Sequence, residues 1–142
     1  MANPMPAFEM DPVIAQAGRS DMNKADLTRK LNDAFRADLA KNGTKGDSGH
    51  EARWGGVVMT PQVHALTETV RCDLMDGIGR FDDFSPENDP YEEHDFGVVS
   101  LHGERFFWKI DYYDLDLRHA SPDPGDAAFT IRVMTIMRAD EY

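Results

Sequence analysis

The segment of residues 105–113 (RFFWKIDYY) constrains the fold of this chain more than any other part of it. Side chains of an extended strand alternate between the two faces of a sheet. One face of this segment is therefore continuously apolar or aromatic: Phe106, Trp108, Ile110 and Tyr112. Full burial of a large apolar side chain contributes roughly 1.5–3 kcal/mol. The segment therefore predicts a strand whose aromatic face lies in the core.

Other segments have the patterns of helices and further strands. Residues 94–101, 128–138 and the short run 54–59 have the composition of strands. A helix is expected over residues 21–41, where an apolar residue recurs at every fourth position, and a second over 61–80, after Thr60 and Pro61. Strands grouped after helices are typical of α+β domains. We therefore expect an antiparallel sheet of three to four strands, with two main helices packed on one face.

A length of 142 residues fits one domain. Residues 1–20 contain several prolines and little periodicity, which predicts a flexible N-terminal arm. The single α+β domain is expected to span residues 21–142. Within it, residues 42–53 are rich in glycine and predict a flexible linker.

The charge of the chain is unevenly distributed. The formal net charge is -11, and residues 76–126 hold 14 acids against 4 bases, a sum of -10. Such a field repels nucleic acid and favours a basic protein partner. The same acids can also act only as a solubilising coat. No apolar run is long enough for a membrane span, and one cysteine excludes an intramolecular disulfide. We therefore expect a cytoplasmic protein that binds neither membrane nor nucleic acid directly.

The sequence contains no recognisable catalytic constellation. Cys72 is a single cysteine in a predicted helix, and no phosphate-binding glycine loop is present. We therefore expect no catalytic residue and no cofactor. The alternative is a metal-binding module or a metal-assisted hydrolase built on residues 89–95, with Asp89, Glu92 and His94 as candidate ligands. Their spacing matches neither a calcium loop nor a His-Glu-x-x-His motif.

The run Asn88-Asp89-Pro90-Tyr91 has a structural interpretation of its own. Asp and Asn side chains accept hydrogen bonds from nearby backbone N–H groups, and proline fixes a turn. We expect Asp89 to cap backbone N–H groups and Tyr91 to pack over the sheet.

Several motifs together resemble one protein family. They are residues 55–60 (GGVVMT), 81–84 (FDDF), 88–91 (NDPY), 93–97 (EHDFG) and 103–114 (GERFFWKIDYYD), with residues 31–36 (LNDAFR) nearer the N-terminus. This chain resembles the DUF3768 family, small bacterial proteins of unknown function. The resemblance implies no catalytic residues. It implies an accessory protein of plasmids and other mobile elements, for which an anti-defence role is plausible by association.

The expected function is that of a non-enzymatic acidic binding protein. Its specific form would be an anti-CRISPR or anti-restriction inhibitor that occupies a basic, nucleic-acid-binding surface of its target. The partner would be a CRISPR or restriction effector. The acids expected to contact it are Asp82, Asp83, Glu87, Asp89, Glu92, Glu93, Asp114 and Asp116.

Overall fold

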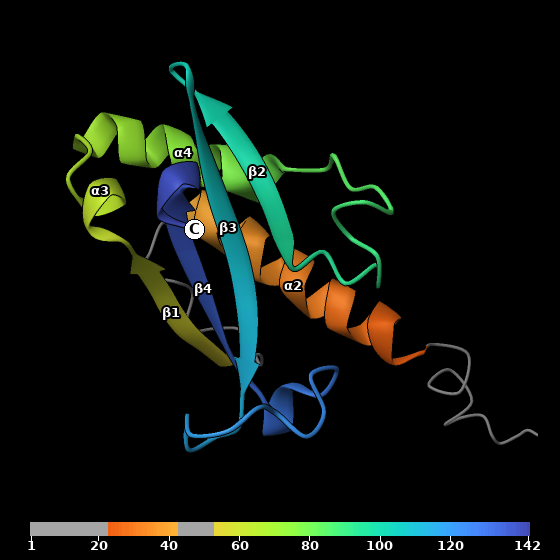
Figure 1. Cartoon of the computed structure of the whole chain (residues 1–142). Helices are drawn as coiled ribbons and strands as arrows, with labels where there is room; N and C mark the ends of the chain where they lie inside the picture. Colours follow the sequence, from red (N-terminus) through yellow and green to blue (C-terminus); the bar gives the residue numbers. More distant parts are fainter. Residues whose placement is uncertain (1–22, 43–52) are drawn as a thin grey trace, which may run out of the picture.

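The computed structural model describes residues 23–42 and 53–142, which form an α+β domain (Figure 1). The predicted arm, residues 1–20, and positions 43–52 of the predicted linker lie outside the described residues. The elements follow in the order α2 (Lys24–Asn42), β1 (Arg53–Met59), α3 (Pro61–His64), α4 (Glu68–Arg80), β2 (Phe96–Leu101), β3 (Glu104–Tyr113), η2 (Ala127–Phe129), β4 (Ile131–Arg138) and η3 (Ala139–Glu141). None of the helices in this described part is long and apolar enough to cross a membrane.

The sheet has four strands in the order β1-β4-β3-β2. β3 is antiparallel to both of its neighbours, but β1 pairs with β4 in parallel. The expected antiparallel sheet is therefore confirmed for β2, β3 and β4, and the edge strand β1 departs from it. Only strands joined by a short hairpin must run antiparallel. β1 is followed by two helices and two other strands before the chain returns as β4, so no hairpin fixes its direction.

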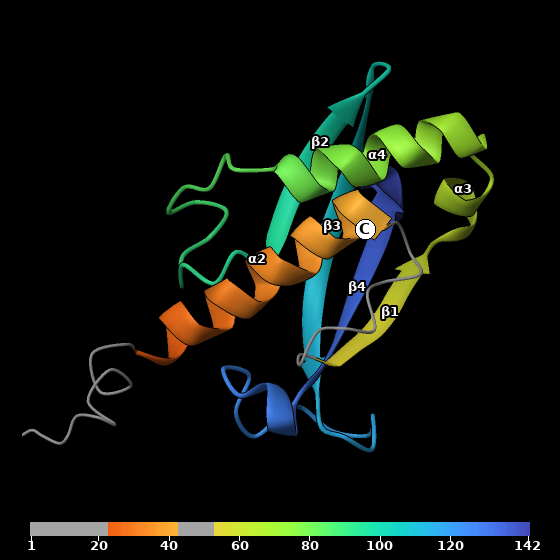
Figure 2. The same cartoon turned by 180° about the vertical axis from the view of Figure 1, so that it is seen from behind.

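The aromatic face of β3 lies in the core, as predicted. Phe106, Trp108 and Ile110 are all buried, and Trp108 has no exposed surface. Figure 2 shows α2 and α4 lying across the same side of the sheet. From these elements and α3, apolar side chains pack against the strands: Phe35, Leu39, Val63, Leu74 and Ile78.

The single helix predicted over residues 61–80 is wrong, because the structure divides it into α3 and α4. Thr67 begins α4 as its N-cap with extended backbone, and its hydroxyl accepts a hydrogen bond from the N–H of Val70. A threonine in this position favours a new helix start over helix continuation. Thr60 and Pro61 begin α3, as predicted.

The buried side of α2 is more polar than its sequence pattern predicts. Phe35 and Leu39 are buried, but so are Asn32, Arg36 and Asp38. A buried polar group needs hydrogen-bond partners. The partners of Asn32 and Arg36 include groups on the segment that connects α4 to β2. This segment, residues 81–95, is called the acidic loop below.

Candidate functional site

The acidic loop forms the corner predicted from its sequence. Asn88 accepts a hydrogen bond from the N–H of Ser85 at 2.9 Å and donates one to the carbonyl of Asp83 at 2.9 Å. Asp89 is buried, and its Oδ1 accepts from the N–H groups of Glu93 at 3.0 Å and His94 at 3.1 Å. These contacts confirm the capping role predicted for Asp89.

Two non-glycine residues of the loop adopt a left-handed backbone. Glu92 has φ 58° and His94 has φ 57°. This region costs an L-residue roughly 1–2 kcal/mol, so surrounding contacts must hold the turn in place. Tyr91 is 77% exposed, so the prediction that it packs over the sheet is wrong. A tight turn with left-handed residues leaves its side chain facing solvent.

Helix α2 holds the acidic loop against the domain. Arg29 donates to the carbonyl of Glu92 at 2.8 Å and Asn32 donates to the carbonyl of Glu93 at 3.0 Å. The Nδ1 atom of His94 lies 2.8 Å from Oδ1 of Asp33. All three contacts join segments more than 60 residues apart in the sequence. The loop is therefore fixed to the helix by side chains on successive turns.

His94 and Phe84 form the centre of this arrangement. Their rings are stacked, with centroids 3.7 Å apart and planes inclined by 3°. The guanidinium of Arg36 lies 5.2 Å from the Phe84 ring and 5.1 Å from the Trp108 ring, a cation–π geometry. Arg36 also bonds Asp33 at 2.6 Å. Stacked rings and an ion pair thus connect the loop to the core.

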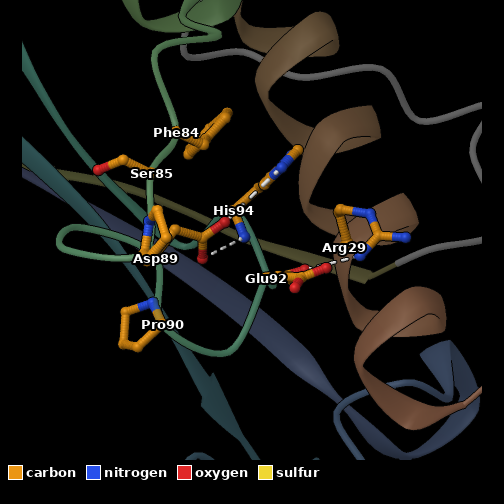
Figure 3. Close-up of a pocket in the computed structure, with 8 residues that line it drawn as sticks. Arg29, Phe84, Ser85, Asp89, Pro90, Glu92 and His94 are labelled. Atoms are coloured by element: carbon orange, nitrogen blue, oxygen red, sulfur yellow. Dashed lines mark hydrogen bonds and ion pairs between the residues drawn. The ribbon is translucent and has the colours of Figure 1, made fainter.

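A cleft of about 330 Å³ opens beside the stacked rings. It is lined by Arg29, Phe84, Ser85, Pro86, Asp89, Pro90, Glu92 and His94. Figure 3 shows the Asp89 carboxylate pointing toward His94, with Arg29 reaching in from the helix. The cleft combines aromatic and proline surface with charged groups, a composition typical of recognition sites.

A buried polar network lies beneath the loop. Asn32 donates to the Tyr112 hydroxyl at 2.7 Å and accepts from Nε of Arg132 at 2.8 Å, and Tyr112 donates to Glu93 at 3.0 Å. Burial raises the pKa of Tyr112 and lowers that of Arg132 to about 10. Burial, reinforced by the Glu93 carboxylate, raises the pKa of Asp95 to about 6. The network ties the loop to β3 and β4.

The eight acids expected to bind a partner have different surroundings. Five are exposed, and none of these five has an ion pair with another described residue: Asp82, Asp83, Glu87, Glu92 and Asp116. Three are engaged by their own chain. Asp89 caps the loop, Glu93 accepts from Tyr112, and Asp114 accepts backbone N–H bonds from Asp116 and Arg118. Hydrogen bonds from residues 116–119 lower the pKa of Asp114.

The structure does not bring all eight acids to one surface. Six belong to the acidic loop, whereas Asp114 and Asp116 follow β3 in the segment that leads to η2. In Figure 1 this second segment lies at the bottom of the molecule, away from the acidic loop. The exposed acids of the acidic loop are thus Asp82, Asp83, Glu87 and Glu92.

The described residues contain no group of three or more His, Cys, Asp or Glu side chains that could hold a metal ion. Of the three candidate ligands, Asp89 uses Oδ1 to cap backbone groups and His94 uses Nδ1 toward Asp33. Glu92 is exposed and offers its backbone carbonyl to Arg29.

Sequence reasoning missed the contribution of α2 to the site. Arg29 and Asp33 lie four residues apart, and Arg36 follows three residues later, so they share one side of a helix. That spacing is a signal for a polar helix face. Nothing in the sequence indicates that this face meets the acidic loop, because the contact depends on how α2 crosses the sheet.

The described residues thus form a small α+β domain in which an acidic loop, held by hydrogen bonds to α2, lies beside a cleft. The chain belongs to the family described as a protein of unknown function (DUF3768), whose model matches residues 59–141. This match confirms the resemblance found in the sequence and includes the whole acidic loop. No curated protein and no solved structure matches the chain.

Proposed function

We propose that this protein is a non-enzymatic binding protein whose acidic loop docks on a basic surface of a protein partner. The observation that carries the proposal is a set of exposed carboxylates, without cationic partners among the described residues, on a loop held by hydrogen bonds to α2. The four are Asp82, Asp83, Glu87 and Glu92. Because hydrogen bonds hold the backbone of the loop, the loop loses little backbone freedom on binding, and ordering it offsets little of the electrostatic attraction.

The exposed aromatic residue of the loop supports the same interpretation. Tyr91 is 77% exposed and lies between Pro90 and Glu92 in the sequence. Tyrosine is enriched among residues that dominate binding energy at protein interfaces. A loop that only kept the protein in solution would gain nothing from an exposed tyrosine ring among its acids. Together these residues suit an interface with an aromatic centre and a charged rim.

The narrower form of the proposal concerns the partner. A surface with fixed carboxylates matches a surface that binds phosphates, because Arg and Lys recognise both groups. We therefore assign the partner to nucleic-acid-binding proteins, specifically CRISPR or restriction effectors, whose nucleic-acid site the acidic loop would occupy. The proposed setting is the cytoplasm, where an exposed free thiol such as that of Cys72 stays reduced.

The test compares two variants with the same change in charge. The loop variant carries Asp82→Asn, Asp83→Asn, Glu87→Gln and Glu92→Gln. The matched control removes four exposed acids from α4 and the C-terminal segment: Glu68→Gln, Asp73→Asn, Asp76→Asn and Asp140→Asn. Each protein is immobilised, and binding of purified CRISPR and restriction effectors is measured at increasing salt, with and without the effector's DNA.

The proposal expects one effector to bind the wild type, to be displaced by its DNA and to bind less tightly as salt increases. The loop variant should weaken that affinity by about tenfold or more, and the control variant should leave it unchanged. An equal loss in both variants would show that only net charge matters. Unchanged binding by the loop variant would contradict the proposed surface.

A further inference from the structure

Two polar side chains, those of Asp89 and His94, lie next to each other in the lining of the cleft. Oδ2 of Asp89 and Nε2 of His94 lie 3.7 Å apart, too far for a hydrogen bond between them. Both residues line the cleft (Figure 3). The protonation pattern of the imidazole decides what this pair can bind.

The contacts of His94 place a proton on one of its two ring nitrogens. Its Nδ1 lies 2.8 Å from Asp33, whose same oxygen also accepts a hydrogen bond from Arg36 at 2.6 Å. An ionised carboxylate only accepts, so Nδ1 must carry the proton. In the neutral ring, Nε2 is then left with a lone pair directed toward the cleft.

Asp89 leaves its second oxygen without a donor. The side chain is only 4% exposed, and both backbone N–H groups that it caps are bound to Oδ1. No described residue donates a hydrogen bond to Oδ2. Asp89 lines the cleft and its Oδ2 is not enclosed, so a ligand N–H group can bind this oxygen together with Nε2 of His94.

The walls of the cleft restrict the kind of donor that fits. Phe84, Pro86 and Pro90 offer apolar surface that suits the aliphatic part of a long side chain. The one cationic group of the lining, Arg29, already bonds Asp26 at 2.7 Å and the carbonyl of Glu92. Because Arg29 is already paired, the carboxylates of Asp89 and Glu92 are the charges that a cation entering the cleft meets.

We propose that this cleft binds one cationic side chain, a lysine or arginine of the partner, with its N–H groups shared between Asp89 Oδ2 and His94 Nε2. An ammonium or a guanidinium supplies two N–H donors from one group, as two neighbouring acceptors require. This inference rests on the proposed function and names the part of the basic partner that the cleft recognises. The surrounding exposed acids then serve the rest of the interface.

The experiment is a titration of the full chain, followed by ¹H–¹⁵N NMR, with three small probes. They are the amides of Nα-acetyl-lysine, Nα-acetyl-arginine and Nα-acetyl-norleucine, the last being neutral. Binding in the cleft should shift the backbone amides of Glu93 and His94, which hydrogen-bond to Asp89. The lysine or arginine probe should bind at millimolar concentration, about tenfold more tightly than norleucine. Equal binding of norleucine, or no shift with any probe, overturns the inference.

Two variants test the acceptor pair. Asp89→Asn keeps an oxygen for the two backbone N–H groups but replaces Oδ2 by an N–H donor. The affinity for the cationic probe should therefore fall by about tenfold. His94→Asn removes Nε2, and asparagine tolerates the left-handed backbone at this position. Asp83→Asn, on the exposed part of the loop, is the control and should bind the probe as the wild type does. Wild-type affinity in both Asp89→Asn and His94→Asn contradicts the assignment.

The outcomes separate this inference from the proposed function. If the loop variant with four neutralised acids loses the effector while Asp89→Asn retains both the effector and the probe, the cleft assignment fails and the docking surface stands. If the cationic probe binds in the cleft but the loop variant binds effectors like the wild type, the docking surface fails and the cleft assignment stands.

Discussion

Replacing Asp89 by alanine should release the acidic loop from the domain while leaving the sheet folded. The carboxylate is 4% exposed and accepts two backbone hydrogen bonds, from Glu93 and His94. Hydrogen bonds to a charged group contribute roughly 1.5–3 kcal/mol each. Because both donors are only partly buried, water can replace part of this stabilisation in the variant. We therefore expect Asp89→Ala to lower the free energy of unfolding by about 2–4 kcal/mol.

The asparagine variant separates the hydrogen bonds from the charge. Asp89→Asn keeps an oxygen at the position of Oδ1, so both backbone N–H groups keep an acceptor of neutral strength. Its cost should be about 1 kcal/mol, well below that of alanine. The difference between the two variants therefore measures the capping of the left-handed turn at Glu92 and His94.

Two measurements check this prediction. Urea unfolding of wild type, Asp89→Ala and Asp89→Asn gives the free energies of unfolding. Native-state hydrogen exchange then reports whether the amides of Glu93 and His94 lose protection while those of β3 retain it. Equal destabilisation by alanine and asparagine would refute the reasoning, and so would unchanged protection of the two loop amides in the alanine variant.

The remaining predictions concern the core, a titrating carboxylate and a helix start. Gly97→Ala should cost about 1–3 kcal/mol in urea unfolding, because its Cβ would lie 2.6 Å from Nε1 of the fully buried Trp108; wild-type stability would contradict that packing. Since the pKa of Asp95 is raised from 3.8 to about 6, the folded state binds its proton more tightly, and Asp95 should lower stability as the pH rises between these values. Asp95→Asn should remove that dependence and raise stability at pH 7 by about 1 kcal/mol, a figure reduced for partial solvation; an unchanged pH profile of unfolding would refute it. Thr67→Ala should lower the melting temperature through about 1 kcal/mol of lost N-capping, and no change would show that the cap contributes nothing.

The strands of this fold were predictable because one face of each central strand is buried. β3 alternates large apolar residues with mixed ones, and its apolar set becomes the centre of the core. Alternation of this kind reports both the strand and its buried face. The direction of β1 could not be predicted in the same way. Hydrophobic pattern identifies a strand but does not identify its neighbour when helices separate the two in the chain.

Helix α2 shows where periodicity misleads. The positions of its apolar residues correctly predict this helix, which was expected over residues 21–41 and spans Lys24–Asn42. They do not predict that Arg36 and Asp38 are buried as well as Phe35, at 4% exposure each against 2%. A charged residue near an apolar stripe is normally assigned to solvent. Burial of Arg36 becomes favourable only where Asp33 and carbonyl groups from residues 78 and 81 approach it.

The site was predictable in composition but not in geometry. The acidic loop is visible in the sequence, and the capping role of Asp89 follows from its type and its proline neighbour. Which of these acids remain exposed depends on tertiary contacts, and a local sequence pattern does not show such contacts. Glu92 and Glu93 are adjacent and chemically alike, yet one is exposed while the other accepts a hydrogen bond from Tyr112. That division is made by side chains outside the loop: Tyr112 of β3, 19 residues from Glu93, and Asn32 of α2, 61 residues from it.

The contacts that hold the acidic loop in place help to decide whether its acids bind a partner or only keep the protein in solution. A solubilising coat needs charge but no fixed geometry, and a mobile loop would supply it at less cost. Here two left-handed residues are maintained by a buried carboxylate, and Arg29 and Asn32 bond the loop carbonyls from α2. Backbone strain persists only where surrounding contacts impose it, and it is concentrated at functional sites. This strain is explained if the loop is shaped in advance for a cationic partner.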